Sequence, residues 1–317
     1  MKLHPEKASR RGLAVRTAAV IAIAAVGMLG LQVGAASAAP AQLPTSQAQV
    51  DQGNGNDKIP PGQEKPKKKD KCRPVANPDG GKWKCTWADE FNGTGIDTSV
   101  WSDIPYGLGL ACASSDADHV QVSGGTLKLL VTENDMADEN CEVWGVEGQY
   151  TGGFIQTQGA FAQNYGRFEM RAKLPSDGGA WPAFWLLPDD NTYDGEIDII
   201  EAYGGRVEDG GDVVDFTVRA PAGQPGVQET CRVFPDSSSD FHTYTLEWTP
   251  TEMRQYVDGE LCATFLGQNP DGSPGWAATF DKPYHVLLDL AMQPWWGPNE
   301  DTTFPIVMEV DYVRVWR

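Results

Sequence analysis

From Cys72 to the last residue, short β-branched or aromatic runs alternate with clusters of Gly, Pro, Asn and Asp. Such runs are typical of β-strands, and the clusters between them are typical of turns. No stretch keeps the 3.6-residue apolar period of an amphipathic helix. The clearest predicted strands are residues 119–122, 126–132, 153–156, 167–174, 183–187, 196–201, 242–248, 285–290 and 307–316.

This pattern predicts an all-β fold, a two-sheet antiparallel β-jelly-roll sandwich. In residues 167–174 charged and apolar side chains alternate strictly, so one sheet should bury one face and present a polar face. The segment of roughly 240 residues is long enough for one large domain with its own core. We therefore assign residues 72–317 to a single domain.

The N-terminal residues 1–38 have the features of a secretory signal peptide. Basic residues precede an apolar stretch from Ala18 to Val33, and Ala36-Ser37-Ala38 fits the cleavage pattern. An Ala-rich apolar core of roughly fifteen residues is too short for a membrane span. We expect an extracellular protein with a mature start at Ala39; the pair Arg10-Arg11 leaves general secretory and twin-arginine export both open.

Residues 39–71 predict a disordered linker. They are rich in Pro, Gln, Gly, Asn and Asp, contain no aromatic residue, and end in a lysine-rich run. That run is interpreted as a solvated tether, with attachment to an acidic cell-wall polymer as the alternative.

The charge balance limits the partners. Without the signal, 20 basic and 43 acidic residues give a net charge of about −23. Nucleic acids and anionic membranes are therefore excluded as partners, because phosphate binding needs clustered positive charge. A neutral polymer suits this surface, and we expect a monomer.

The six cysteines predict disulfides, because the chain is bound for an oxidising compartment and contains neither a CxxC pair nor a run of histidines. Fifteen pairings are open. The order along the chain favours neighbours, namely Cys72 with Cys85, Cys112 with Cys141, and Cys231 with Cys262.

The acidic run Glu196-Ile197-Asp198-Ile199-Ile200-Glu201 contains the strongest candidate site. In a regular strand Glu201 points away from Glu196 and Asp198, but a β-bulge at Ile199-Ile200 returns it to their face. Two glutamates on one face suit retaining glycoside hydrolysis, with carboxyl groups ~5.5 Å apart. Asp198 between them would help Glu201 keep a proton and orient Glu196.

An acidic edge strand or a calcium site is the alternative. Like charges on one sheet face are destabilising without a function that retains them, which favours catalysis. Residues 179–187 add tryptophans just upstream, and aromatic faces are what sugar rings stack on.

At these residues the sequence resembles glycoside hydrolase family 16, whose bulged, laminarinase-like bacterial branch carries Glu-x-Asp-x-x-Glu. The resemblance extends over about residues 83–317 and includes residues 87–93, 165–175, 181–185, 240–244 and 308–315 in the family's order. It implies a concanavalin-like jelly roll with a concave glycan-binding cleft, with Glu196 as nucleophile, Glu201 as acid/base and Asp198 assisting.

The resemblance also implies substrate contacts. Trp181 matches a position that stacks on sugar beside the scissile bond, and Trp295 or Trp296 falls in a loop that often lines the cleft. Arg171 is a candidate for binding sugar hydroxyls from the polar sheet face. A solvated arginine is the alternative.

The sequence constrains the identity of the polysaccharide less closely than it constrains the catalytic residues. β-1,3-Glucan is the favoured substrate. Arg219, however, replaces a histidine that is common in laminarinases, and residues 292–298 depart from the usual Gly-Gly-Asn-Trp pattern of the family. Arg219 would suit an acidic or sulfated sugar, or it pairs with a cleft acid. A galactan hydrolase, a transglycosylase and a non-catalytic lectin stay open.

Catalysis of this kind needs no cofactor. Family members commonly carry a structural calcium on the convex side. The matching positions here are Asp311 by side chain, with Glu90 and Gly125 through backbone oxygen.

Overall fold

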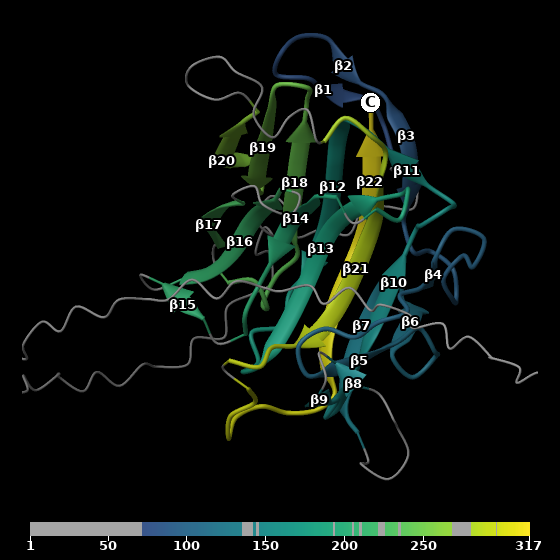
Figure 1. Ribbon diagram of the computed structural model, residues 1–317, viewed down its shortest axis with the longest axis vertical. Helices are drawn as coiled ribbons and strands as arrows, with labels where there is room; N and C mark the ends of the chain where they lie inside the picture. The colour runs from purple at the N-terminus through teal and green to yellow at the C-terminus, as the bar shows by residue number, and fades with distance from the viewer. Residues whose placement is uncertain are drawn as a thin grey trace, which may run out of the picture. The chain divides into compact units, whose positions relative to one another are not determined.

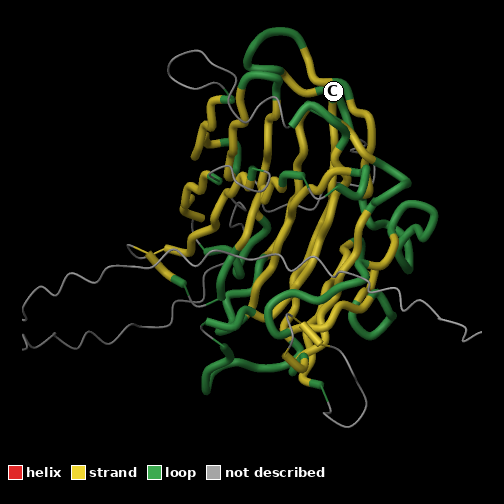
Figure 2. The backbone as a smooth tube through the Cα atoms, viewed as in Figure 1, coloured by secondary structure: helices red, strands yellow, loops and turns green. Residues whose placement is uncertain are grey.

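A computed structural model describes residues 72–134, 142–143, 146–192, 194–204, 206–208, 211–220, 226–233, 236–267, 280–295 and 297–317. These residues all belong to one compact unit, residues 58–317. They contain strands and loops and no helix, as Figure 2 shows, and hence no helix that could span a membrane. The predicted signal peptide and linker lie outside the described residues.

One sheet is built around β22, which pairs with β12 along one edge and with β7 and then β3 along the other. Figure 1 shows part of its order, from β20 through β19, β18 and β12 to β22. Its strands are β3 (Cys85–Asp89), β5 (Ala111–Ser114), β6 (Val120–Ser123), β7 (Thr126–Glu133), β12 (Gly166–Lys173), β18 (His242–Trp248), β19 (Glu252–Val257), β20 (Glu260–Leu266) and β22 (Ile306–Trp316).

The second sheet has the order β17, β16, β14, β13, β21, β10 and β4. Two short strands add to it, β15 on β16 and β11 on β21. The bounds are β4 (Ser102–Asp103), β10 (Tyr150–Gln156), β11 (Ala162–Gln163), β13 (Ala180–Pro188), β14 (Glu196–Glu201), β15 (Val207–Glu208), β16 (Gly211–Arg219), β17 (Val227–Val233) and β21 (Tyr284–Met292).

Strand β10 joins the two sheets, because its first half pairs with β5 and β7 and its second half with β21 and β4. The β5–β10 pair is parallel, whereas all other pairs between described strands are antiparallel. Two small hairpins complete the fold: β1 (Val75–Ala76) with β2 (Lys82–Trp83), and β8 (Glu142–Val143) with β9 (Val146–Glu147). The predicted all-β sandwich is confirmed.

The core lies between the sheets, and side-chain alternation decides which residues enter it. Phe216 of β16 stacks on Phe265 of β20, with ring centroids 4.8 Å apart, so this face of β16 points at the other sheet. The residues on either side of it, Asp215 and Thr217, therefore lie on the outer face of the second sheet. Aromatic pairs of this kind add ~0.5–1.5 kcal/mol to the burial of their surface.

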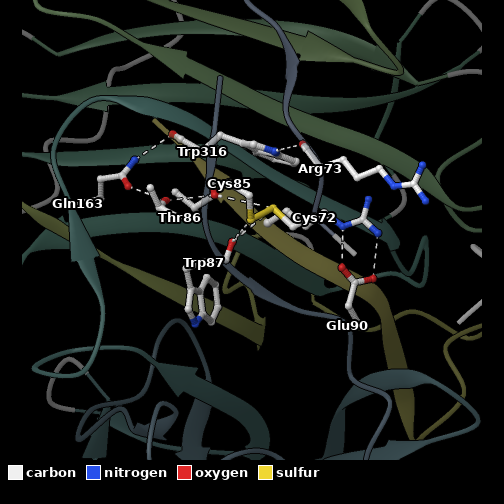
Figure 3. Close-up of a disulfide and its surroundings, with 10 residues drawn as sticks. Cys72, Arg73, Cys85, Thr86, Trp87, Glu90, Gln163 and Trp316 are labelled. Atoms are coloured by element: carbon white, nitrogen blue, oxygen red, sulfur yellow. Dashed lines mark hydrogen bonds and ion pairs between the residues drawn. A yellow bond between two sulfur atoms is a disulfide. The ribbon is translucent and has the colours of Figure 1, made fainter. Parts of the chain in front are cut away.

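Disulfides fasten two edges of the sandwich. Cys231 of β17 is bonded to Cys262 of β20 and so connects the edge strands of the two sheets. The Cys72–Cys85 bond holds the N-terminal segment against β22, where Trp316 donates a hydrogen bond to the carbonyl oxygen of Arg73 at 2.6 Å (Figure 3). Each bridge contributes ~3 kcal/mol by closing a modest loop. The third expected pair, Cys112–Cys141, includes a residue outside the described ones.

Candidate active site

Strand β14 contains the three acids singled out in the sequence, and it has a bulge where the sequence predicts one. Consecutive residues of β13 pair with Asp198 and Ile200, so Ile199 is an extra residue of β14. The register with β16 also slips between Asp198 and Glu201. The extra residue turns Glu201 to the face of Glu196, which is the outer face of the sheet.

One guanidinium contacts all three acids. Arg219 of β16 places Nε 2.6 Å from Glu196 Oε1 and 3.2 Å from Asp198 Oδ2, while its Nη2 lies 3.1 Å from Glu201 Oε2. The side chains of Asp198 and Glu201 are 4% and 7% exposed, whereas that of Glu196 is 28% exposed. Glu196 is therefore the most accessible of the three acids to an incoming sugar.

Aromatic rings line the Glu201 end of the site. Trp181 of β13 donates from Nε1 to Glu201 Oε1 at 3.1 Å. The ring of Trp181 lies 5.7 Å from that of Tyr203 and 5.8 Å from that of Trp295, measured between centroids. Trp295 is 53% exposed, so much of its side chain is open to solvent next to Trp181. Trp296 lies outside the described residues.

Burial shifts two of the acids toward their protonated forms. Burial raises the pKa of Asp198 well above its ordinary value, and the charges of Glu196 and Glu201 raise it further. Burial likewise raises the pKa of Glu201, although the charge of Arg219 acts in the opposite direction. A carboxyl that keeps its proton near neutral pH is suited to donate it in catalysis.

Two further acids lie on the same face, and sequence reasoning missed both. Asp289 of β21 is fully buried, and its Oδ1 accepts a hydrogen bond from Trp185 Nε1 at 2.7 Å. Burial raises the pKa of Asp289 well above its ordinary value. Asp215 pairs across the strands with Glu201 and forms an ion pair with Arg206 at 2.6 Å. A lone acid inside an apolar strand, as in residues 285–290, is the signal that marks Asp289.

The sequence pattern described as "Glycosyl hydrolases family 16" matches residues 111–314. The chain belongs to this family. It is 34% identical over 258 residues to the beta-glucanase of Rhodothermus marinus, with 74% of this chain and 85% of that protein covered. It is 30% identical over 271 residues to the glucan endo-1,3-beta-glucosidase A1 of Niallia circulans, covering 73% of this chain but 37% of that longer protein.

Solved structures of family 16 enzymes share the fold. The laminarinase from Rhodothermus marinus superposes with a TM-score of 0.63 at 34% sequence identity, covering 74% of this chain and 97% of that one. The laminarinase-like resemblance stated from the sequence motifs is thereby confirmed. Family 16 hydrolases use carboxyl groups and need no catalytic cofactor.

The expectation that Arg171 binds sugar is wrong. Arg171 belongs to β12, in the sheet opposite the one that contains the acids. It forms a buried ion pair with Asp311, from Nη1 to Oδ2 at 2.7 Å, and its guanidinium lies over the ring of Phe241. The charged alternation of residues 167–173 identifies an outer face, but it does not say to which sheet that face belongs.

Of the residues predicted to hold calcium, Asp311 belongs to β22, Glu90 follows β3, which pairs with β22, and Gly125 lies in the turn between β6 and β7. Arg171 already binds one oxygen of the Asp311 carboxylate. In the part of the chain that the structure describes, no three His, Cys, Asp or Glu side chains form a metal-binding group.

Proposed function

We propose that this family 16 hydrolase is a retaining endo-β-1,3-glucanase in which Glu196 is the nucleophile and Glu201 the acid/base. The supporting observation is the contact of one guanidinium with both glutamates. Given the size of that fork, the two carboxylate oxygens that it contacts are at most about 8 Å apart, a limit that includes the ~5–5.5 Å of retaining enzymes and the lower part of the ~6.5–9.5 Å of inverting ones.

In the first step, a carboxylate oxygen of Glu196 forms a bond to the anomeric carbon. The bond from that carbon to the glycosidic oxygen breaks as Glu201 gives this oxygen its proton. The product is a glycosyl ester on Glu196 and a released sugar chain. In the second step Glu201 takes a proton from water, whose oxygen displaces Glu196 from the sugar.

Asp198 lies between the two glutamates with its side chain almost fully buried. We assign it an assisting role, because a protonated carboxyl beside the nucleophile can orient it by hydrogen bonding.

β-1,3-Glucan is proposed because the proteins of Rhodothermus marinus and Niallia circulans described above are named as glucanases, and because the nitrogens of Arg219 contact the acids. A guanidinium used in this way is less suited to receive a sulfate or carboxylate of the sugar. A neutral chain also suits a protein with a formal net charge of −19.

The test is a panel of laminarin, mixed-linkage glucan, galactan, agarose and carrageenan, with products sized at early times. We expect laminarin to be cut fastest, to oligosaccharides of mixed length. Product oligosaccharides that grow longer with time would mean a transglycosylase. Binding without any product would mean a lectin, and preference for carrageenan would overturn the proposed substrate.

Trp295 is proposed to line the cleft and to stack on a sugar ring of the bound chain. Trp295→Ala should raise KM for laminarin ~3–10-fold and change kcat little, since an aromatic contact contributes ~0.5–1.5 kcal/mol. Leu266→Ala is the matched control, because Leu266 is 64% exposed on β20, in the other sheet. Equal KM values for the two variants would exclude Trp295 from the binding surface.

Export is also a proposal. We infer that residues 1–38 are removed and that residues 39–71 form a linker to the domain of residues 72–317. N-terminal sequencing of protein secreted into the medium should begin at Ala39. Protein retained in the cell with Met1 intact would contradict export.

A structural calcium near Asp311 stays a prediction. Because Arg171 compensates the charge of Asp311, this carboxylate would attract a cation only weakly. A cation bound there would be coordinated by the carboxylate oxygen that Arg171 does not bind. A chelator should therefore lower the melting temperature only slightly and leave the initial rate unchanged. Loss of activity on chelation, restored by calcium, would contradict a purely structural role.

A further inference from the structure

Arg219 stands at the last position of β16, where it pairs across the strands with Glu196. Its guanidinium spans the bulge of β14, since Nε faces Glu196 and Asp198 while Nη2 reaches Glu201. The two ends of a rigid planar fork therefore bind residues that are separated by the irregular part of the strand.

The charges around this guanidinium are mainly negative. Besides the three acids of β14, the groups that face the site are Asp215 of β16, Asp289 of β21 and the hydroxyl of Tyr203. Asp215 is paired with Arg206. In the described residues, every ion pair made by the three acids of β14 is made with Arg219.

Resting on the function proposed above, we propose that Arg219 is a positioning residue of the reaction. It holds the carboxylates of Glu196 and Glu201 at a fixed separation across the bulge and compensates their charge. In this role the guanidinium serves the acids, and an anionic sugar is the competing partner for its exposed part, since the side chain is 42% exposed. Misplacing reacting groups by about 1 Å can cost ~10²-fold in rate, so this positioning should affect kcat rather than substrate binding.

The charge of Arg219 also sets the direction of a pH effect. Arg219 lowers the pKa of Glu201, which burial raises. Removing the positive charge should raise the pKa of Glu201 further. Because the protonated form of Glu201 is the active acid, the alkaline limb of the kcat profile should move to higher pH.

The experiment compares Arg219→Met, which removes the charge, with Arg219→Lys, which keeps the charge but loses the fork. On laminarin the methionine variant should lose at least ~10-fold in kcat with KM within ~3-fold, and its alkaline limb should move upward. The lysine variant should lose kcat while its alkaline limb stays closer to that of the wild type. Arg254→Met is the control, because Arg254 pairs with Asp79 at the other sheet.

Three results would overturn the proposal. They are an unchanged kcat and pH limb in Arg219→Met, a loss that appears only as a raised KM, and a loss confined to sulfated substrates. If the methionine variant does not fold, Arg219→Gln is measured in its place. Glu196→Gln is assayed in parallel. Activity in that variant would refute the proposed function itself. If Glu196→Gln is inactive while Arg219→Met keeps the kcat of the wild type, only the role of Arg219 is refuted.

Discussion

Glu196→Gln should lose at least about a hundredfold in kcat on laminarin, ~2.7 kcal/mol of barrier, while still binding the polysaccharide. The amide keeps the shape of the side chain and can still accept a hydrogen bond from Arg219, but it cannot form the glycosyl ester. Initial rates and binding to insoluble glucan measure the two halves of this expectation separately.

Glu260→Gln is the matched control for this variant, because Glu260 is an exposed glutamate on β20, in the other sheet. It should keep the rate of the wild type. Activity of Glu196→Gln above about a hundredth of wild type in a clean preparation would remove Glu196 from the role of nucleophile.

Glu201→Ala should lose ~10²–10⁴-fold on laminarin, because the leaving oxygen no longer receives a proton. An aryl laminari-oligosaccharide with a good leaving group should be much less impaired in the first step, since its leaving group needs no acid. Removal of the side chain also leaves space beside the glycosyl ester for a small anion. Azide added to Glu201→Ala with the aryl substrate should therefore restore turnover and give a β-glycosyl azide.

The configuration of the azide product makes this test specific. Attack by azide on an ester at Glu196 inverts that carbon a second time, so the β configuration is required. An α-azide, or no rescue in a folded variant, would mean that Glu201 is not the acid/base. The melting temperature should be measured alongside, because Glu201 accepts a hydrogen bond from the buried Trp181.

Much of this site could be predicted from local sequence. The spacing of Glu196, Asp198 and Glu201 predicts both the shared face and the bulge, because strand periodicity and one extra residue are local properties. The tryptophans of residues 181–185 could be predicted as part of the site for the same reason, because they are close to the acids in the sequence. These predictions need no knowledge of which strands are neighbours.

The rest depends on strand pairing over long separations. Arg219 reaches the acids because β16 lies beside β14, and Asp289 joins the same face because β21 lies beside β13. Arg171 is excluded because β12 belongs to the other sheet. Alternation gives the two faces of each strand, but it does not say which strands share a sheet, so the pairing of Arg171 with Asp311 could not be foreseen.

The stereochemistry of hydrolysis tests the central claim most directly. If Glu196 and Glu201 face one another across the bond that is cut, no water fits between Glu196 and the anomeric carbon, and two displacements retain configuration. Proton NMR of a fresh laminarin digest should show the β-anomer of the new reducing end first, with the α-anomer appearing only by mutarotation. An α-anomer formed first would contradict the account, because it would require a single displacement by water and a wider separation of the two carboxylates.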